Sequence, residues 1–290
     1  MKFCQDHNLF LWSKLFNFGL KIIIIRKVIQ FKIKHELKKV LDIIREMDKK
    51  IITIFLAIAL LQTLSFYFTS RRFFREYLFE YFQNNSDPYL LEYAYWFIGD
   101  FITFFLIGIL ILKFGFKEKL SDYGLKLGDY KTGLLFSVFF LFVMIILIWF
   151  VSATPAFAEK YPHLQSAKTN WGTLLIYETG MLLYMIAWEF IWRGFMLFGL
   201  EKKFGYYSVL IQMIPFVILH NGKPFLETFG AIFGGIALGI LALRTRSIYY
   251  CIVIHIGVMY SIDFISSLRF RANDYGIGFT SIINLIKQIF

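Results

Sequence analysis

Glu189 and Arg193 lie four residues apart in a long apolar stretch that contains the sequence YMIAWEFIWRGFMLF. A charge inside a membrane is costly, so an ionisable residue at that depth is a functional hypothesis by default. Positions i and i+4 share one face of a helix, so the two side chains can form an ion pair. A carboxylate held in a dry pocket can act as a general base toward water, while the arginine keeps it ionised. The alternative is a purely structural pair.

Two histidines lie in or at the edge of other apolar stretches. His220 ends PFVILH, and His255 lies in YYCIVIHIGVMYSID, eight residues before Asp263. Positions i and i+8 lie close to one helix face, so His255 and Asp263 can both point inward. A polar cavity shared by these groups and the Glu189–Arg193 pair is the simplest explanation for ionisable residues within membrane-spanning segments. Such a set suits peptide-bond hydrolysis inside a membrane, and it also suits a proton relay.

The histidines have several chemical uses in such a cavity. They can orient the attacking water, stabilise an oxyanion or bind a divalent metal such as zinc. Two histidines and one carboxylate can make a catalytic zinc set, for which His220 and His255 are the ligand candidates. Nothing in the sequence demands zinc, so the cofactor stays open. Cys4 and Cys251 have no metal-ligand spacing and are too few for a disulfide framework.

The elements that position these residues are predicted to be membrane-spanning helices. The 290 residues are 58% hydrophobic and 18% charged, against roughly a quarter charged in soluble domains. Alternating strand patterns are absent, so the predicted fold class is an all-α polytopic membrane helix bundle of about seven spans with a polar cavity inside the membrane. The fifth span is short and holds Pro215, and the charged stretch RRFFRE (71–76) predicts a loop. The predicted spans are 51–69, 91–114, 132–152, 173–199, 205–220, 226–243 and 248–268.

The N-terminal segment is strongly basic, with twelve of the 31 Lys and Arg residues in 1–50. Its apolar residues follow helical spacing, which predicts an interfacial amphipathic helix that contacts anionic lipid, and no nucleic-acid binding. A cytoplasmic helix packed on the bundle is the alternative. With the N-terminus inside, Lys and Arg number 21 inside and 9 outside, which predicts an integral membrane protein with a cytoplasmic N-terminus. The chain thus divides into the basic segment 1–50, a bundle 51–268 and a tail 269–290.

The polar residues of these spans resemble the motifs of the CPBP family of intramembrane proteases. This family includes the type 2 CAAX prenyl endopeptidases and bacterial bacteriocin-processing and immunity relatives. Its pattern is Glu-Glu-x-x-x-Arg, then Phe-x-x-x-His, then a His followed four residues later by Asn or Asp. The residues that fall on this pattern are, in order, Trp188, Glu189 and Arg193, then Phe216 and His220, then His255. The likeness covers about 117–265, and three short motifs in this order are jointly specific.

The resemblance implies an intramembrane endopeptidase, a hydrolase that cleaves a membrane-associated peptide or a prenylated protein in the bacterial plasma membrane. Glu189 would activate water, and Arg193 would hold Glu189. His220 and His255 would position the water, stabilise the oxyanion or bind the metal of a metalloprotease. Glu178 lies on nearly the same helix face as Glu189 but about 16 Å away, which is too far to share its water.

Two positions depart from the family pattern. Trp188 stands where the family has its first glutamate, which is implied to activate the water. Glu189 cannot simply inherit that geometry, because consecutive helix positions point about 100° apart. Met259 stands four residues after His255, in place of Asn or Asp. The remaining supporting candidates are Asn221 and Asp263.

These departures leave two functions open. One is a variant protease that uses Glu189. The other is a catalytically inactive family member that acts as a membrane interaction or immunity protein. A carrier is a third class, which the absence of inverted repeats disfavours.

Overall fold

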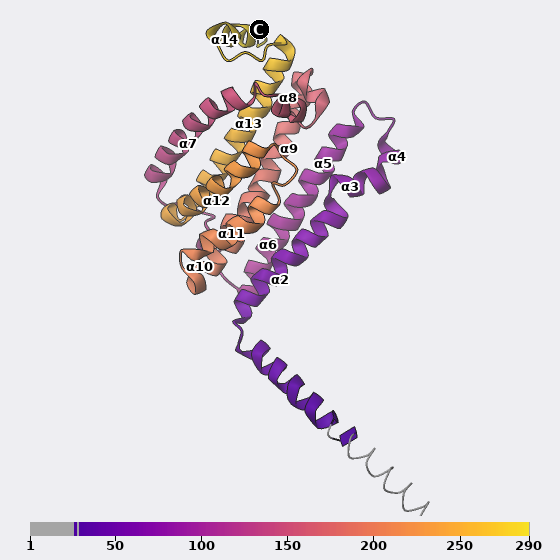
Figure 1. Cartoon of the computed structure of the whole chain (residues 1–290), viewed down its shortest axis with the longest axis vertical. Coiled ribbons are helices and arrows are strands. Elements are labelled where there is room, and N and C mark those ends of the chain that lie inside the picture. The colour runs from indigo at the N-terminus through magenta and orange to yellow at the C-terminus, as the bar shows by residue number, and fades with distance from the viewer. Residues whose placement is uncertain (1–25, 28, 290) are drawn as a thin grey trace, which may run out of the picture. The chain divides into compact units, whose positions relative to one another are not determined.

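The computed structural model describes residues 26, 27 and 29–289, and within them every regular element is a helix (Figure 1). Six helical segments are long and apolar enough to cross a membrane, and α11 is a shorter apolar helix. The predicted all-α polytopic bundle is therefore confirmed. The chain divides into two compact units, Met1–Ile52 and Thr53–Phe290.

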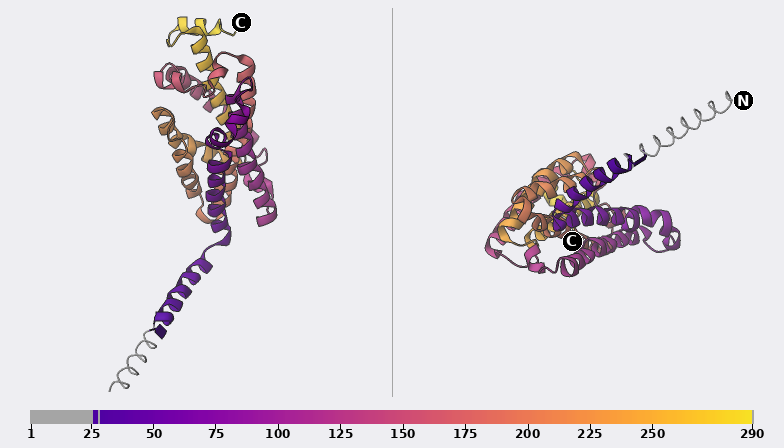
Figure 2. Two further views of the ribbon diagram at one scale, coloured as in Figure 1. Left: turned by 90° about the vertical axis from the view of Figure 1, so that its right-hand side faces the viewer. Right: turned by 90° about the horizontal axis from the view of Figure 1, so that it is seen from below.

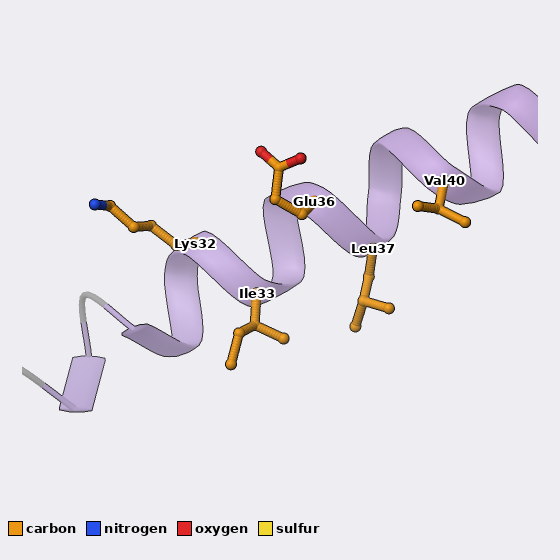
Figure 3. Close-up of a pocket in the computed structure, with 5 residues that line it drawn as sticks. All are labelled: Lys32, Ile33, Glu36, Leu37 and Val40. Carbon is orange, nitrogen blue, oxygen red and sulfur yellow. The ribbon is translucent and has the colours of Figure 1, made fainter.

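The described part of the first unit is mainly a helix over 29–46. Figure 3 shows Ile33 and Leu37 on one side of this helix and Lys32 and Glu36 on the opposite side. Ile33 and Leu37 are 54% and 56% exposed, so the apolar side is open. The helix and its apolar stripe are as predicted, while the contact with lipid stays a prediction.

The spanning segments lie in the second unit, apart from residues 49–52 at the start of the first segment, and several of them combine α-helical and π-helical parts. These segments are Lys49–Phe82, Pro88–Phe116, Tyr130–Val151, Trp171–Phe204, Phe225–Thr245 and Tyr249–Ala272. The α-helices are α2 (Lys49–Leu64), α3 (Arg71–Phe73), α4 (Phe79–Phe82), α5 (Pro88–Asp100), α6 (Ile107–Leu110), α7 (Tyr130–Val151), α8 (Pro155–Lys160), α9 (Trp171–Glu189), α10 (Gly199–Phe204), α11 (Tyr207–Ile218), α12 (Phe225–Thr245), α13 (Tyr249–Ala272) and α14 (Phe279–Ile286). The π-helical segments are η1 (Ser65–Thr69), η2 (Phe74–Leu78), η3 (Phe101–Leu106), η4 (Ile111–Phe116) and η7 (Phe190–Phe198), and the 3-10 turns are η5 (Leu120–Tyr123) and η6 (Gln165–Lys168).

Local capping sets the ends of the long helices. Asp87, Asp129 and Asn170 precede α5, α7 and α9, and each side chain accepts a hydrogen bond from the backbone N–H three residues later. These bonds satisfy donors that a helix start leaves unpaired. Arg246 and Asn273 follow α12 and α13 in the left-handed conformation, which ends each helix.

The stretch RRFFRE is helical, so the loop predicted at 71–76 is wrong. It forms α3 and the first part of η2. Two of its three arginines have a buried partner, because Arg71 and Arg75 both donate to the carboxylate of Glu92 on α5. Glu92 is fully buried. Arginines whose charge is neutralised by a carboxylate can lie within a helical segment. The local sequence does not show this carboxylate, because it lies on another helix.

The fifth predicted span is the short helix α11. Its 12 residues extend about 18 Å, whereas the hydrocarbon core of a bilayer is about 30 Å thick. Pro215 lies inside this helix, which packs against α12 and η7. The ring of His220, in the turn after α11, reaches Trp188 near the middle of Trp171–Phe204. Because α11 is short, His220 in the turn that follows it lies in the interior of the bundle.

The segment Trp171–Phe204 forms the core around which the site is built. Its α9 part packs between α5 on one side and α13 on the other (Figures 1 and 2). All nine residues of η7 are buried. The side chains of Glu189 and Arg193 on this segment are therefore enclosed by neighbouring helices.

Candidate active site

The Glu189–Arg193 pair forms as the spacing predicts. Glu189 is the last residue of α9, and Arg193 lies within the π-helical segment η7. Nη1 of Arg193 donates to Oε1 of Glu189 at 2.9 Å, and both side chains are fully buried. Segments of π-helix occur often at functional sites. The pair alone still fits both a catalytic and a structural role.

His255 on α13 joins the same carboxylate. Its Nδ1 lies 2.6 Å from Oε1 of Glu189. A carboxylate can only accept, so this nitrogen carries the hydrogen. Oε1 therefore accepts two hydrogen bonds, while Oε2 of Glu189 is buried without a partner. That oxygen is the acceptor that this site leaves for one further donor, such as a water molecule.

His220 is held by its own turn. Its Nδ1 lies 2.7 Å from the backbone oxygen of Phe216, and the side chain is buried. A carbonyl oxygen only accepts, so Nδ1 donates and a neutral ring has Nε2 as its acceptor. His220 makes no hydrogen bond to Glu189, although it lies within its electrostatic range. The two predicted histidines are thus placed at one site with different partners.

Phe216 connects the charged and imidazole groups of the site. The Cζ atom of Arg193 lies 4.1 Å from the centroid of its ring, a cation–π geometry. The centroids of the rings of His220 and His255 lie 4.5 and 6.0 Å away. The motif spacing marks this phenylalanine, but only the fold places its ring among all three polar side chains.

Trp188 occupies the side of the site that faces His220. The centroids of these two rings are 6.3 Å apart, and the ring of Trp188 lies 6.0 Å from that of Phe216. Glu189, the next residue, faces His255 instead. The chain therefore has an aromatic ring toward one histidine and a carboxylate toward the other.

The two supporting candidates lie away from the Glu189–His255 contact. Asn221 is exposed. Asp263 is fully buried on α13, but the carboxyl group that it meets is that of Glu178. The prediction that Glu178 does not share the water of Glu189 agrees with this arrangement. Neither supporting candidate contacts Glu189, because the register between α9 and α13 brings Asp263 to a different level.

The residues of this site do not fit a zinc set. Among the residues that the structure describes, no group of three or more His, Cys, Asp or Glu side chains is placed to hold a metal ion. The carboxylate that would have to join the two histidines is that of Glu189, and it already accepts from Arg193 and His255. The guanidinium of Arg193 opposes the charge of a metal ion at that carboxylate.

A loop outside the spanning segments closes against the start of α12. The ring of His163 stacks on Tyr161 with centroids 4.5 Å apart, and Tyr161 donates to the carboxylate of Glu227. Lys223 donates to the other oxygen of Glu227 at 2.6 Å. Burial is the main cause that lowers the pKa of His163 to about 4, so its ring is neutral at neutral pH. No local pattern in the sequence marks this cluster.

Comparison with known proteins identifies one family. Residues 170–260 match the family model Rce1-like, described as type II CAAX prenyl endopeptidase Rce1-like. The matched segment includes α9, η7, α11, α12 and the first half of α13, and so contains Glu189, Arg193, His220 and His255. No curated protein and no solved structure matches the chain significantly.

Proposed function

The chain belongs, through residues 170–260, to the CPBP family of membrane proteases, and on that premise we propose that it is an intramembrane endopeptidase in which Glu189 activates water. The observation that carries this proposal is how the two carboxylate oxygens of Glu189 are hydrogen-bonded. Arg193 and His255 both hold Oε1, and Oε2 is buried without a partner. A fixed, ionised carboxylate with one free oxygen is suited to bind a water molecule and to take its proton.

The proposed reaction is the hydrolysis of a peptide bond. Water donates a hydrogen bond to Oε2 of Glu189, and its oxygen attacks the scissile carbonyl as the proton moves to the carboxylate. The proton then passes from Glu189 to the leaving amine. Nε2 of His220, as the acceptor of a neutral ring, would orient the second hydrogen of the water.

Donors for the developing oxyanion are present beside Glu189. Nε and Nη2 of Arg193 and Nε1 of Trp192 are buried without an acceptor. Buried donors aimed at a developing negative charge are a large source of catalysis, because a water-excluded site strengthens their effect. We assign the oxyanion contact to Arg193, which would then serve both the base and the transition state.

The proposed substrate is a membrane-embedded, prenylated or peptide substrate, since the site lies inside an integral membrane protein. The test uses purified protein in detergent or lipid, incubated with a library of peptides and prenyl-peptides and analysed by mass spectrometry. Cleavage by the wild type is expected to be lost in Glu189→Gln and to fall sharply in His220→Ala and His255→Ala. Asp100→Asn is the matched control, because this buried carboxylate on α5 has its own donors in Ser65, Thr69 and Trp96. Equal cleavage by wild type and Glu189→Gln would contradict the proposal.

Trp188 supports a second candidate, a catalytically inactive member that acts as a membrane interaction or immunity protein. Its ring faces His220 from the position at which the family pattern has its first glutamate. The variant Trp188→Glu separates the two candidates. If the chain is inactive, this variant should gain cleavage that the wild type lacks, whereas a working Glu189 site should not need it.

For the N-terminal segment we propose contact with anionic lipid on the cytoplasmic face of a bacterial plasma membrane. The open apolar side of the helix over 29–46 and the basic residues around it support this assignment. Apolar burial at the headgroup boundary and attraction to anionic lipid act together in such helices.

A further inference from the structure

A second group of buried polar atoms lies on α9 and α13, outside the Glu189 site. Glu178 is 8% exposed and Asp263 is fully buried. All four of their carboxylate oxygens lack a hydrogen-bond partner. Among the described residues, 14 buried side-chain atoms have no partner, and seven of them belong to this group. The seven are contributed by Tyr177, Glu178, Asp263, Ser266 and Ser267.

The register of α9 and α13 explains why the two carboxyl groups meet. His255 contacts Glu189, and the hydroxyl of Tyr260 donates to the backbone oxygen of Glu178 at 2.7 Å. Asp263 follows Tyr260 by three residues, close to one helical turn, so it comes level with Glu178. The two carboxyl groups lie close enough to hydrogen-bond, but as carboxylates neither has a hydrogen to donate. Glu178 precedes Glu189 by about 16 Å along the helix, so this is a separate site.

Every unpartnered atom in this group is an oxygen. The hydroxyl of Tyr177 is buried and lies within the electrostatic range of Asp263. Ser266 and Ser267 follow Asp263 by three and four residues, which places them on its helix face. Their hydroxyls are buried as well. The hydroxyls of Ser266 and Ser267 thus share a helix face with Asp263, and the hydroxyl of Tyr177 lies within the electrostatic range of the same carboxyl group.

The chain supplies little positive charge to these carboxyl groups. Lys223 acts electrostatically on Asp263, but its ammonium group already bonds to Glu227 at 2.6 Å. Two carboxylates inside a membrane are very costly without a compensating charge. Carboxylate and hydroxyl oxygens are the ligands that hard cations such as Na⁺ and Ca²⁺ prefer.

We propose that Glu178 and Asp263 bind a hard metal cation between α9 and α13, with hydroxyl oxygens of Tyr177, Ser266 and Ser267 beside it. No third acidic or histidine ligand is placed there among the described residues, so hydroxyl, carbonyl or water oxygens complete the shell. The cation would join α9 and α13, the helices that carry Glu189 and His255, at a point about 16 Å along α9 from Glu189. The proposal is independent of whether Glu189 is catalytic.

The test is the thermal stability of the whole purified protein in detergent, after removal of metals. Chlorides of Na⁺, K⁺, Mg²⁺ and Ca²⁺ are added singly, with choline chloride at equal ionic strength as the reference. At saturation, one of the four cations is expected to raise the Tm by roughly 5 °C or more. Equilibrium dialysis with elemental mass spectrometry should find about one bound ion per chain for that cation.

Matched variants locate the site. Glu178→Gln and Asp263→Asn should lose both the Tm shift and the bound ion, while Asp100→Asn should keep both. If the single variants fail to fold, the double variant Glu178→Gln/Asp263→Asn serves instead, because two amides can hydrogen-bond to each other without a cation. Retention of the shift in the variants would overturn the proposal. So would a wild type that binds none of the four cations and is stabilised only by lowering the pH, since the pair would then share a proton.

Discussion

The Glu189 carboxylate and the His255 imidazole, 66 residues apart in the chain, are joined by a contact of 2.6 Å between Oε1 and Nδ1. Because the carboxylate only accepts, this contact fixes Nδ1 of His255 as the donor. It ties α9 to α13 and holds one oxygen of the buried Glu189 carboxylate in place. The second oxygen is left without a partner, which is the feature on which the proposed chemistry depends.

Removal of Arg193 should destabilise the protein strongly. The variant Arg193→Met leaves the buried charge of Glu189 without its guanidinium partner, which typically costs about 3–5 kcal/mol. Thermal unfolding in detergent measures the loss. The double variant Glu189→Gln/Arg193→Met removes both charges and should recover a large part of the stability. A double variant as unstable as Arg193→Met would contradict a buried ion pair.

Phe216→Leu should weaken the site while it keeps an apolar side chain. The change removes the aromatic face that lies 4.1 Å from Cζ of Arg193, an interaction worth about 2 kcal/mol when desolvated. The Tm should fall, and any cleavage should fall with it. Phe104→Leu is the control, because this buried ring on η3 has no cation over its face among the described contacts. An equal fall in Tm in both variants would show that the loss comes from packing alone and not from the cation–π contact.

His163 should make the stability of the protein depend on pH. Burial lowers its folded-state pKa to about 4 from an ordinary value of 6.5, so the unfolded chain binds more protons between these values. The stability that the neutral ring contributes is fully present above pH 6.5 and is lost as the pH falls toward 4. The loss amounts to about 3 kcal/mol at most.

Thermal unfolding of wild type and His163→Phe at pH 7 and pH 4.5 isolates this contribution. The aromatic variant cannot titrate but can still stack on Tyr161. The Tm difference between the two proteins should shift in favour of the variant at pH 4.5. Parallel pH profiles would contradict the assignment of His163 as a half-buried, neutral ring.

A peptide of residues 26–50 should bind anionic vesicles and gain helicity there. The apolar side of the helix is predicted to enter the headgroup boundary, while its lysines interact with the anionic lipid. Circular dichroism with anionic and zwitterionic vesicles measures this. Ile33→Glu/Leu37→Glu should abolish binding, and Lys32→Gln should weaken it only modestly. Equal binding to both kinds of vesicle would remove the electrostatic part of the prediction.

Local patterns in the sequence predict the helical membrane bundle and the chemical types at the site. Apolar length indicates the spanning segments, and the spacing of Glu189 and Arg193 predicts their ion pair. The length of a span and the pairing of residues four apart depend only on residues within one helix, so the sequence pattern predicts them. The short span that contains Pro215 can be recognised in the sequence for the same reason, because its length is a local property.

The tertiary structure decides which helix faces which, and therefore which residue each polar group meets. It pairs Glu189 with His255 and turns Trp188 toward His220. It also brings Asp263 to Glu178 rather than to the Glu189 site. These partners depend on the rotation and register of helices far apart in the chain, and a shift of one residue rotates a side chain by about 100°. No local pattern contains that information, because it arises from the packing of all the helices together.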